Sequence, residues 1–134
     1  MMTKEGFLKM KDSNDFDKED LARWFSNTYI CFWCELTEPD KKKWNYGDVF
    51  HHIEGRRGEF NASLLNCCFI NNDLCHLPHH PLLKRYPSRI LLLRKTLEHL
   101  MNQGYELTKL DEGFMEAHQD EYRQIVEQKE LETK

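Results

Sequence analysis

The sequence predicts a small α+β domain with short strands in its middle and helices on both sides. Its 134 residues are enough for one domain with a modest core. Short apolar segments near residues 50 and 67 fit strands, and the 3.6-residue spacing of apolar side chains near both ends fits helices. With 40% hydrophobic and 31% charged residues, the composition is that of an ordinary soluble protein. A net charge of −4 excludes a uniformly basic protein that coats nucleic acid.

The N-terminal region predicts an arm followed by a helix. Residues 1–14 are polar, so we expect a mobile arm, and they lack the apolar stretch of a secretory signal, so we expect a cytoplasmic protein. No apolar run approaches the roughly 20 residues that span a membrane. A helix is expected from Asp17 to a point before Cys31. Its apolar face would carry Leu21, Trp24, Phe25 and Tyr29.

The middle of the chain predicts strands separated by turns. The basic segment Thr37 to Tyr46 contains turn residues, and Asp48 to Ile53 fits a short strand. Glu54 to Phe60 fits a loop because it holds two glycines. Leu64 to Ile70 fits either the return strand of a hairpin or the opening of a buried turn. A helix is expected after Asp73, limited by Pro78 and Pro81.

Two helices are expected in the C-terminal third, between about residues 88 and 131. Ser88 can cap the first of them and Gly104 can end it. The second is expected from Asp111 to Glu130. The expected apolar faces are Ile90, Leu93, Leu97, Leu100 and Met101 in the first helix, and Phe114, Met115, Tyr122, Ile125 and Val126 in the second.

Histidine and asparagine carry the most informative pattern. The pair His51 and His52 ends the expected strand, Asn66 follows fourteen residues after His52, and His76 and His80 come later, four residues apart. This pattern resembles that of the HNH, or His-Me finger, endonucleases over about thirty residues, or about fifty if Cys31 to Cys34 belong to it. The resemblance implies a ββα metal finger from about Asp48 to Tyr86, within an HNH-like core of about residues 31–86 and flanked by the N-terminal and C-terminal helices.

Phosphodiester hydrolysis explains why such residues suit a nuclease. It requires an activated water and stabilisation of negative charge. Adjacent side chains on a strand point to opposite faces, so one of His51 and His52 can bind a metal while the other takes up a proton. The resemblance implies that His52 is the general base and that Asn66 orients its imidazole by a hydrogen bond. It also implies that the metal ligands are His51, His76 and His80.

Alternatives remain open at several of these positions. His79 competes with His80, and Asn61 competes with Asn66. The histidine pair can also be ordinary hydrogen-bonded side chains of a core or surface. The metal could be Mg, Mn, Ni or Zn.

The five cysteines suggest a second, structural metal site. In a chain without an export signal, thiols more often bind metals or pack in a core than form disulfides. Cys31, Cys34 and Cys75 are candidate zinc ligands, and Cys68 or His79 could be the fourth. The alternative is that the cysteines are reduced core residues, which we expect for Cys67 and Cys68 in any case.

Basic residues are candidates for contacts with phosphate. Arg56 and Arg57 lie in the glycine-containing loop, where they can bind phosphate or can be a solvated turn. With Lys41 to Lys43, Lys84 and Arg85 they could form a local positive surface on an acidic protein. Tryptophans at 24, 33 and 44 can stack on bases but more often belong to a core.

The expected function is hydrolysis of DNA by an endonuclease with one catalytic divalent metal. The resemblance implies a phage or mobile-element nuclease, acting in the host cytoplasm if phage-encoded. Its partners would be DNA and a second copy of the chain, or a phage or recombination protein. The alternative is a noncatalytic module, stabilised by metal, that binds nucleic acid or protein.

Overall fold

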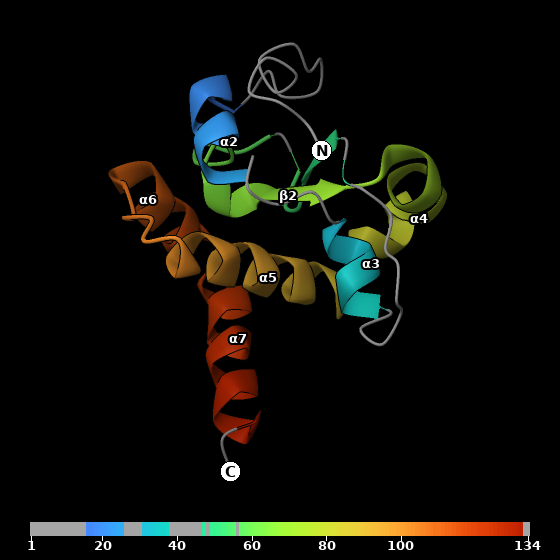
Figure 1. The fold of residues 1–134 in the computed structure, drawn as a ribbon. Helices are drawn as coiled ribbons and strands as arrows, with labels where there is room; N and C mark the ends of the chain where they lie inside the picture. Colours follow the sequence, from blue (N-terminus) through green and yellow to red (C-terminus); the bar gives the residue numbers. More distant parts are fainter. Residues whose placement is uncertain (1–15, 26–30, 38–46, 48, 56, 133–134) are drawn as a thin grey trace.

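The structure is a computed structural model, and it describes residues 16–25, 31–37, 47, 49–55 and 57–132. The expected arm at residues 1–14, Lys41 to Lys43 and Arg56 lie outside these residues. The elements are α2 (Lys18–Phe25), α3 (Phe32–Thr37), β1 (Val49–His52), η2 (Leu64–Asn66), β2 (Cys67–Ile70), η3 (Asn72–His76), α4 (Leu77–Leu83), α5 (Ser88–Asn102), α6 (Lys109–Ala117) and α7 (Gln119–Glu132) (Figure 1).

A two-stranded antiparallel sheet confirms the α+β class. β1 pairs with β2 so that His51 lies opposite Cys68 and His52 opposite Cys67. The segment Leu64 to Ile70 is therefore a return strand preceded by a short 3₁₀ turn. Ser63 begins that turn, where its hydroxyl accepts a hydrogen bond from the backbone of Leu65.

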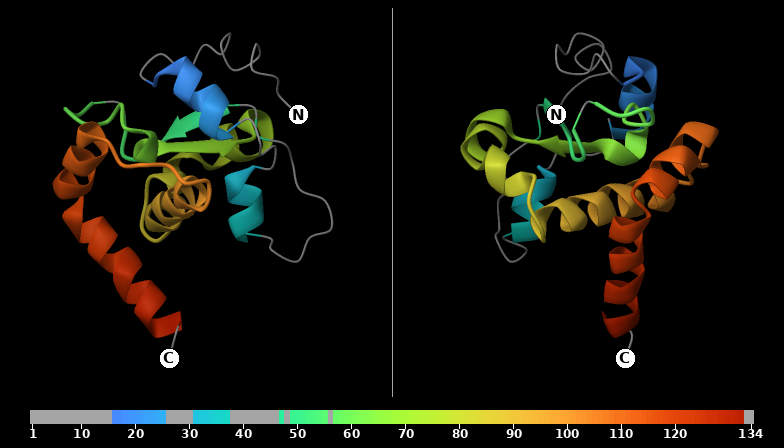
Figure 2. Two further views of the ribbon diagram at one scale, coloured as in Figure 1. Left: turned by 60° about the vertical axis from the view of Figure 1, so that its left-hand side comes forward. Right: turned by 180° about the vertical axis from the view of Figure 1, so that it is seen from behind.

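The core forms where α2, α3 and α5 meet the sheet. In Figures 1 and 2, α5 runs along one side of the strands and α2 lies on the other. Phe25 of α2 contacts Phe50 of β1 and the His99 ring of α5, with ring centroids 5.3 and 5.0 Å away. The Thr96 hydroxyl donates to the Cys67 carbonyl, so α5 is bonded directly to β2. These contacts hold both strands against helices far away in the sequence.

Helix α5 ends as the sequence predicts. Gly104 has a φ of +79°, and its amide donates to the Met101 carbonyl. The Tyr105 amide donates to the Leu100 carbonyl, which completes a Schellman motif. Met101 is 40% exposed, so it does not belong to the buried face, whereas Leu92 does. The expected cap at Ser88 is wrong, because the N-cap residue is Pro87 and Ser88 is the first residue of the helix.

The prediction of one long helix after Asp111 is wrong. The backbone leaves the helical conformation at His118, with φ −121° and ψ 38°, so α6 and α7 are separate helices. α6 starts earlier than expected because Thr108 and Asp111 form a capping box. α7 extends away from the body of the protein (Figures 1 and 2), and Val126 is 54% exposed there.

Gly113 brings α6 against the loop that follows β1. A Cβ on Gly113 would lie 2.4 Å from the Phe60 ring, so only glycine lets that ring pack against the helix. Beside it, the Ser63 hydroxyl donates to the buried Asp111 carboxylate at 2.6 Å. The α6 helix and the loop are therefore in close contact at two points.

The sequence did not predict helix α3. Three of its side chains are buried, those of Phe32, Trp33 and Cys34. Within the described residues, no helix is long and apolar enough to cross a membrane.

Candidate metal centres and active site

Three histidine rings converge between β1 and α4. The ring centroid of His51 lies 5.1 Å from that of His76 and 5.5 Å from that of His80, and the last two are 5.1 Å apart. One ring nitrogen from each can be chosen so that all three lie within 4.8 Å of one another. His51 is buried, His76 is half-buried and His80 is exposed, so the group opens toward solvent at His80. These are the three ligands that the HNH resemblance implies.

The local backbone explains how His76 and His80 come together. Asn72–His76 forms a π-helical turn, in which the His76 amide donates to the Asn71 carbonyl at 2.8 Å. α4 follows directly, with Pro78 in its first turn and Pro81 inside it. The four-residue spacing in this helical segment places both histidines on one side. The two prolines therefore leave the histidine group intact.

The environment of His51 keeps its imidazole neutral. Burial, and to a lesser extent the positive charges of Lys84 and of the neighbouring histidines, lowers the pKa of His51 to about 2. Its Nε2 atom is buried and has no hydrogen-bond partner among the described residues. A neutral imidazole with a buried, unpaired nitrogen is the form that binds a metal ion. The donor set therefore fits a divalent cation, and three imidazoles suit zinc or nickel better than magnesium.

His52 lies on the opposite face of β1 from His51. Its ring stacks on Phe16, with centroids 4.4 Å apart, and only 5% of the residue is exposed. The expected division of the pair between two faces is observed. The expected general base is covered by an aromatic side chain, which the sequence did not indicate.

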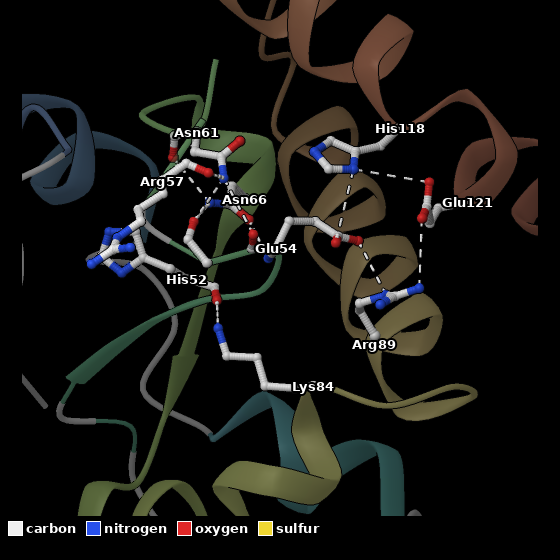
Figure 3. A network of polar contacts seen from close by, with 10 residues as sticks. His52, Glu54, Arg57, Asn61, Asn66, Lys84, Arg89, His118 and Glu121 are labelled. Carbon is white, nitrogen blue, oxygen red and sulfur yellow. Dashed lines mark hydrogen bonds and ion pairs between the residues drawn. The ribbon is translucent and has the colours of Figure 1, made fainter. Parts of the chain in front are cut away.

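Asn66 holds the turn that follows His52. Its side-chain oxygen accepts from the Glu54 amide, and its amide group donates to the carbonyls of Gly55 and Asn61 (Figure 3). We expected Asn66 to bond to the His52 imidazole, but its side chain bonds to backbone groups instead. Asn61, the alternative candidate, donates to the carbonyls of Glu54, Gly55 and Arg57. Both asparagines therefore fix the same turn.

Lys84 contributes to this region in a way that sequence reasoning missed. Its ammonium group donates to the His52 carbonyl at 2.9 Å (Figure 3). Because Lys84 directly follows α4, the bond ties the end of β1 to the end of the helix that carries His80. The positive charge also lies near His51, as its effect on the pKa of that residue indicates.

A second cluster contains Cys31, Cys34 and Cys75. Their sulfur atoms lie within 4.8 Å of one another, and the Cys34 and Cys75 sulfurs are 3.3 Å apart. Tetrahedral zinc with bonds of about 2.3 Å places its sulfur ligands about 3.8 Å apart, so the cluster needs only small adjustments to hold zinc. Burial raises the pKa of Cys75, and the Cys34 thiol raises it further, so a cation would be needed to keep the thiolate form.

Among the described residues, the other two cysteines lie outside this cluster. Cys68, one candidate for the fourth ligand, is buried in β2 outside the group, and the side chain of His79 lies outside the described residues. Cys67 is also fully buried. Both strand cysteines are thus free core thiols, as expected.

Of the candidates for phosphate contact, the structure describes Arg57, Lys84 and Arg85. Arg57 and Arg85 are exposed, so their side chains are available to bind phosphate. Trp33 is only 9% exposed and Trp24 packs against Tyr105, so these two tryptophans belong to the core and its edge. Trp44 lies outside the described residues.

An ion-pair network that the sequence did not reveal adjoins the turn. The Glu54 carboxylate, whose side chain is 8% exposed, lies 3.3 Å from Arg89, which also reaches Glu121 at 3.5 Å (Figure 3). His118 lies 3.8 Å from Glu54 and 3.9 Å from Glu121. Burial raises the pKa of Glu54, and the charge of Arg89 opposes that effect. This network joins the turn to α5 and α7.

Comparison of the chain with protein-family models, curated proteins and solved structures finds no match.

Proposed function

We propose that this protein is a metal-dependent endonuclease that hydrolyses phosphodiester bonds in DNA. The observation that carries the proposal is the convergence of His51, His76 and His80, with an open side at His80, on the strand that also carries His52. The order of β1, β2 and α4 is similar to the ββα metal finger that the HNH resemblance implies. In this proposal the three histidines hold one divalent cation and His52 is the general base.

Each part of the site has a separate role in the proposed reaction. A bound cation would polarise the phosphate and stabilise the charge that develops on its oxygens. His51, kept neutral by burial, supplies the most buried of the three ligands. Asn66 and Asn61 hold the turn after His52, so they set the position of the strand end that carries the base.

Phe16 imposes a requirement on this mechanism. Because the ring covers His52, DNA can reach the imidazole only if Phe16 moves aside. The proposal therefore includes displacement of Phe16 when DNA binds.

The covered position of His52 also favours a second candidate function. A noncatalytic module, in which the metal stabilises a surface that binds nucleic acid or protein, would need no access to this ring. In that case His52 is a stacking partner in the core.

Cleavage of supercoiled plasmid in the presence of Mg²⁺, Mn²⁺, Ni²⁺ or Zn²⁺ distinguishes the two functions. We expect nicking by the wild type and a loss on the order of 10² or more in turnover for His52→Ala, with metal binding retained. His51→Ala should instead weaken metal binding. The matched control is His99→Gln, because His99 lies in α5 away from the cluster. Metal binding and DNA binding without any cleavage would support the noncatalytic module.

A further inference from the structure

The two candidate metal clusters meet at consecutive residues. Cys75 belongs to the cysteine cluster, and His76 belongs to the histidine cluster. Both residues lie in the π-helical turn η3, and both of their amides donate to the Asn71 carbonyl, at 3.1 and 2.8 Å. A single carbonyl therefore fixes the backbone of one ligand from each cluster. A displacement of Cys75 would also displace His76.

The remaining ligands of each cluster come from other elements. Cys31 directly precedes α3 and Cys34 lies within it, whereas His51 lies on β1. α3 packs against β2 and α5, so its cysteines have a fixed position relative to the sheet. A metal on the three sulfurs would thus attach η3 to α3.

We propose that zinc bound by Cys31, Cys34 and Cys75 controls the affinity of the histidine cluster for its own divalent cation. Zinc suits the cysteines because thiolates select it. It fixes Cys75, and through the Cys75–His76 peptide it holds the His76 ring toward His51 and His80. This inference rests on the metal site of the proposed function and adds its regulation: the histidine cluster binds its cation well only when the cysteine cluster is filled.

The size of the effect can be bounded. Groups that orient metal ligands typically change metal affinity by about 10- to 100-fold when they are removed. Coupling between two binding sites is reciprocal, so the cation at the histidines must strengthen zinc binding by the same factor.

Manganese is a suitable probe of the histidine cluster because it binds thiolates poorly. Electron paramagnetic resonance detects free Mn²⁺, so a titration gives its dissociation constant for the wild type with one equivalent of zinc and after zinc is removed by a chelator. We expect binding to be about 10- to 100-fold weaker without zinc. Equal affinities in the two states would overturn the proposal.

Cysteine variants test whether the cysteine cluster is responsible for the change in Mn²⁺ affinity. Cys34→Ala removes one zinc ligand from α3 and leaves every residue of η3 unchanged in identity, whereas Cys67→Ala removes a buried thiol that lies outside the cluster. Only Cys34→Ala should weaken Mn²⁺ binding. Circular dichroism checks the fold: loss of helix on zinc removal would mean general unfolding and would contradict a local linkage.

The reverse measurement needs no cysteine variant. Saturating Mn²⁺ should tighten zinc binding by the same factor in the wild type, and this effect should disappear in His80→Ala, a change at an exposed residue. If the zinc affinity does not change with Mn²⁺, the linkage is overturned even if the protein cleaves DNA. Linked binding without cleavage would overturn only the nuclease, whereas absence of Mn²⁺ binding in every state would overturn both proposals.

Discussion

Phe16 and His52 form a nearly parallel stacked pair, with ring centroids 4.4 Å apart and an angle of 17° between the ring planes. Both residues are at most 5% exposed. Phe16 comes just before α2, whereas His52 ends β1. A residue from the start of the described chain therefore controls access to the candidate base.

Phe16→Ala should uncover the His52 ring. We expect faster modification of His52 by diethyl pyrocarbonate, located by peptide mass spectrometry, and a loss of about 3 kcal/mol in the free energy of unfolding. Phe114→Ala is the control, since it removes another buried phenylalanine, in α6. That variant should lose stability without exposing His52. If both variants leave His52 equally protected, Phe16 is not its cover.

Asn66→Ala should destabilise the turn after His52. The change leaves the Glu54 amide and the Gly55 carbonyl with fewer partners, and each buried polar group left unpaired costs about 1–3 kcal/mol. Urea unfolding measures the loss. Asn102→Ala, at an exposed position in the last turn of α5, should change stability far less. Equal losses in the two variants would show that the Asn66 bonds contribute little.

The pair formed by Glu54 and Arg89 can be tested by a double-mutant cycle. Arg89→Gln should be clearly destabilising because it removes the main positive charge from a buried carboxylate. Adding Glu54→Gln to that variant should recover part of the stability, because the uncompensated charge is then gone. Thermal unfolding of the four proteins gives the coupling. If the two changes simply add, the network does not stabilise the turn.

His99 should make stability depend on pH. Burial lowers the pKa of His99 in the folded protein, and the charge of Lys95 lowers it as well. The bond to the Trp24 carbonyl and the charge of Glu35 oppose this shift. On acidification the unfolded chain, with a histidine pKa of about 6.5, takes up its proton first, so stability falls below that pH. Unfolding measured at pH 7 and pH 5 should therefore show a larger loss for the wild type than for His99→Gln. Identical losses would rule out this contribution.

Binding to duplex DNA should depend on salt. Each phosphate contact lowers the slope of log affinity against log salt by about 0.9, and we expect a total slope of roughly −3 to −5. Arg57→Ala should reduce its magnitude by about one, with the same loss for unrelated sequences. Arg123→Ala removes an exposed arginine from α7 and should leave the slope unchanged. Binding that does not respond to salt would favour the protein-interaction module.

The sequence predicts the strands because their signals are local, whereas the grouping of His51 with His76 and His80 came from the HNH resemblance. The spacing of His76 and His80 on a helical segment, and the histidine pair at a strand end, need no knowledge of distant contacts. The end of α5 is equally local, since Gly104 alone supplies the positive φ.

Features that depend on distant contacts could not be predicted. The stacking of Phe16 on His52 joins residues 36 positions apart in the chain, and the bond from Lys84 to the His52 carbonyl involves a backbone atom without a sequence signal. The break between α6 and α7 was missed because the apolar pattern continues through His118. α3 is only six residues long, which is too short for periodicity to detect.

The contact of Gly113 with Phe60 determines how the chain can be divided. Gly104 looks like a natural boundary for a shorter protein, because it lies in a turn with no atom near its missing Cβ. A fragment that stops there would keep every ligand of the cysteine and histidine clusters. It would expose the Phe60 ring to water and leave the Ser63 hydroxyl without its carboxylate acceptor. The shorter fragment should therefore expose apolar surface and aggregate, so biochemical work on either metal cluster requires the C-terminal helices.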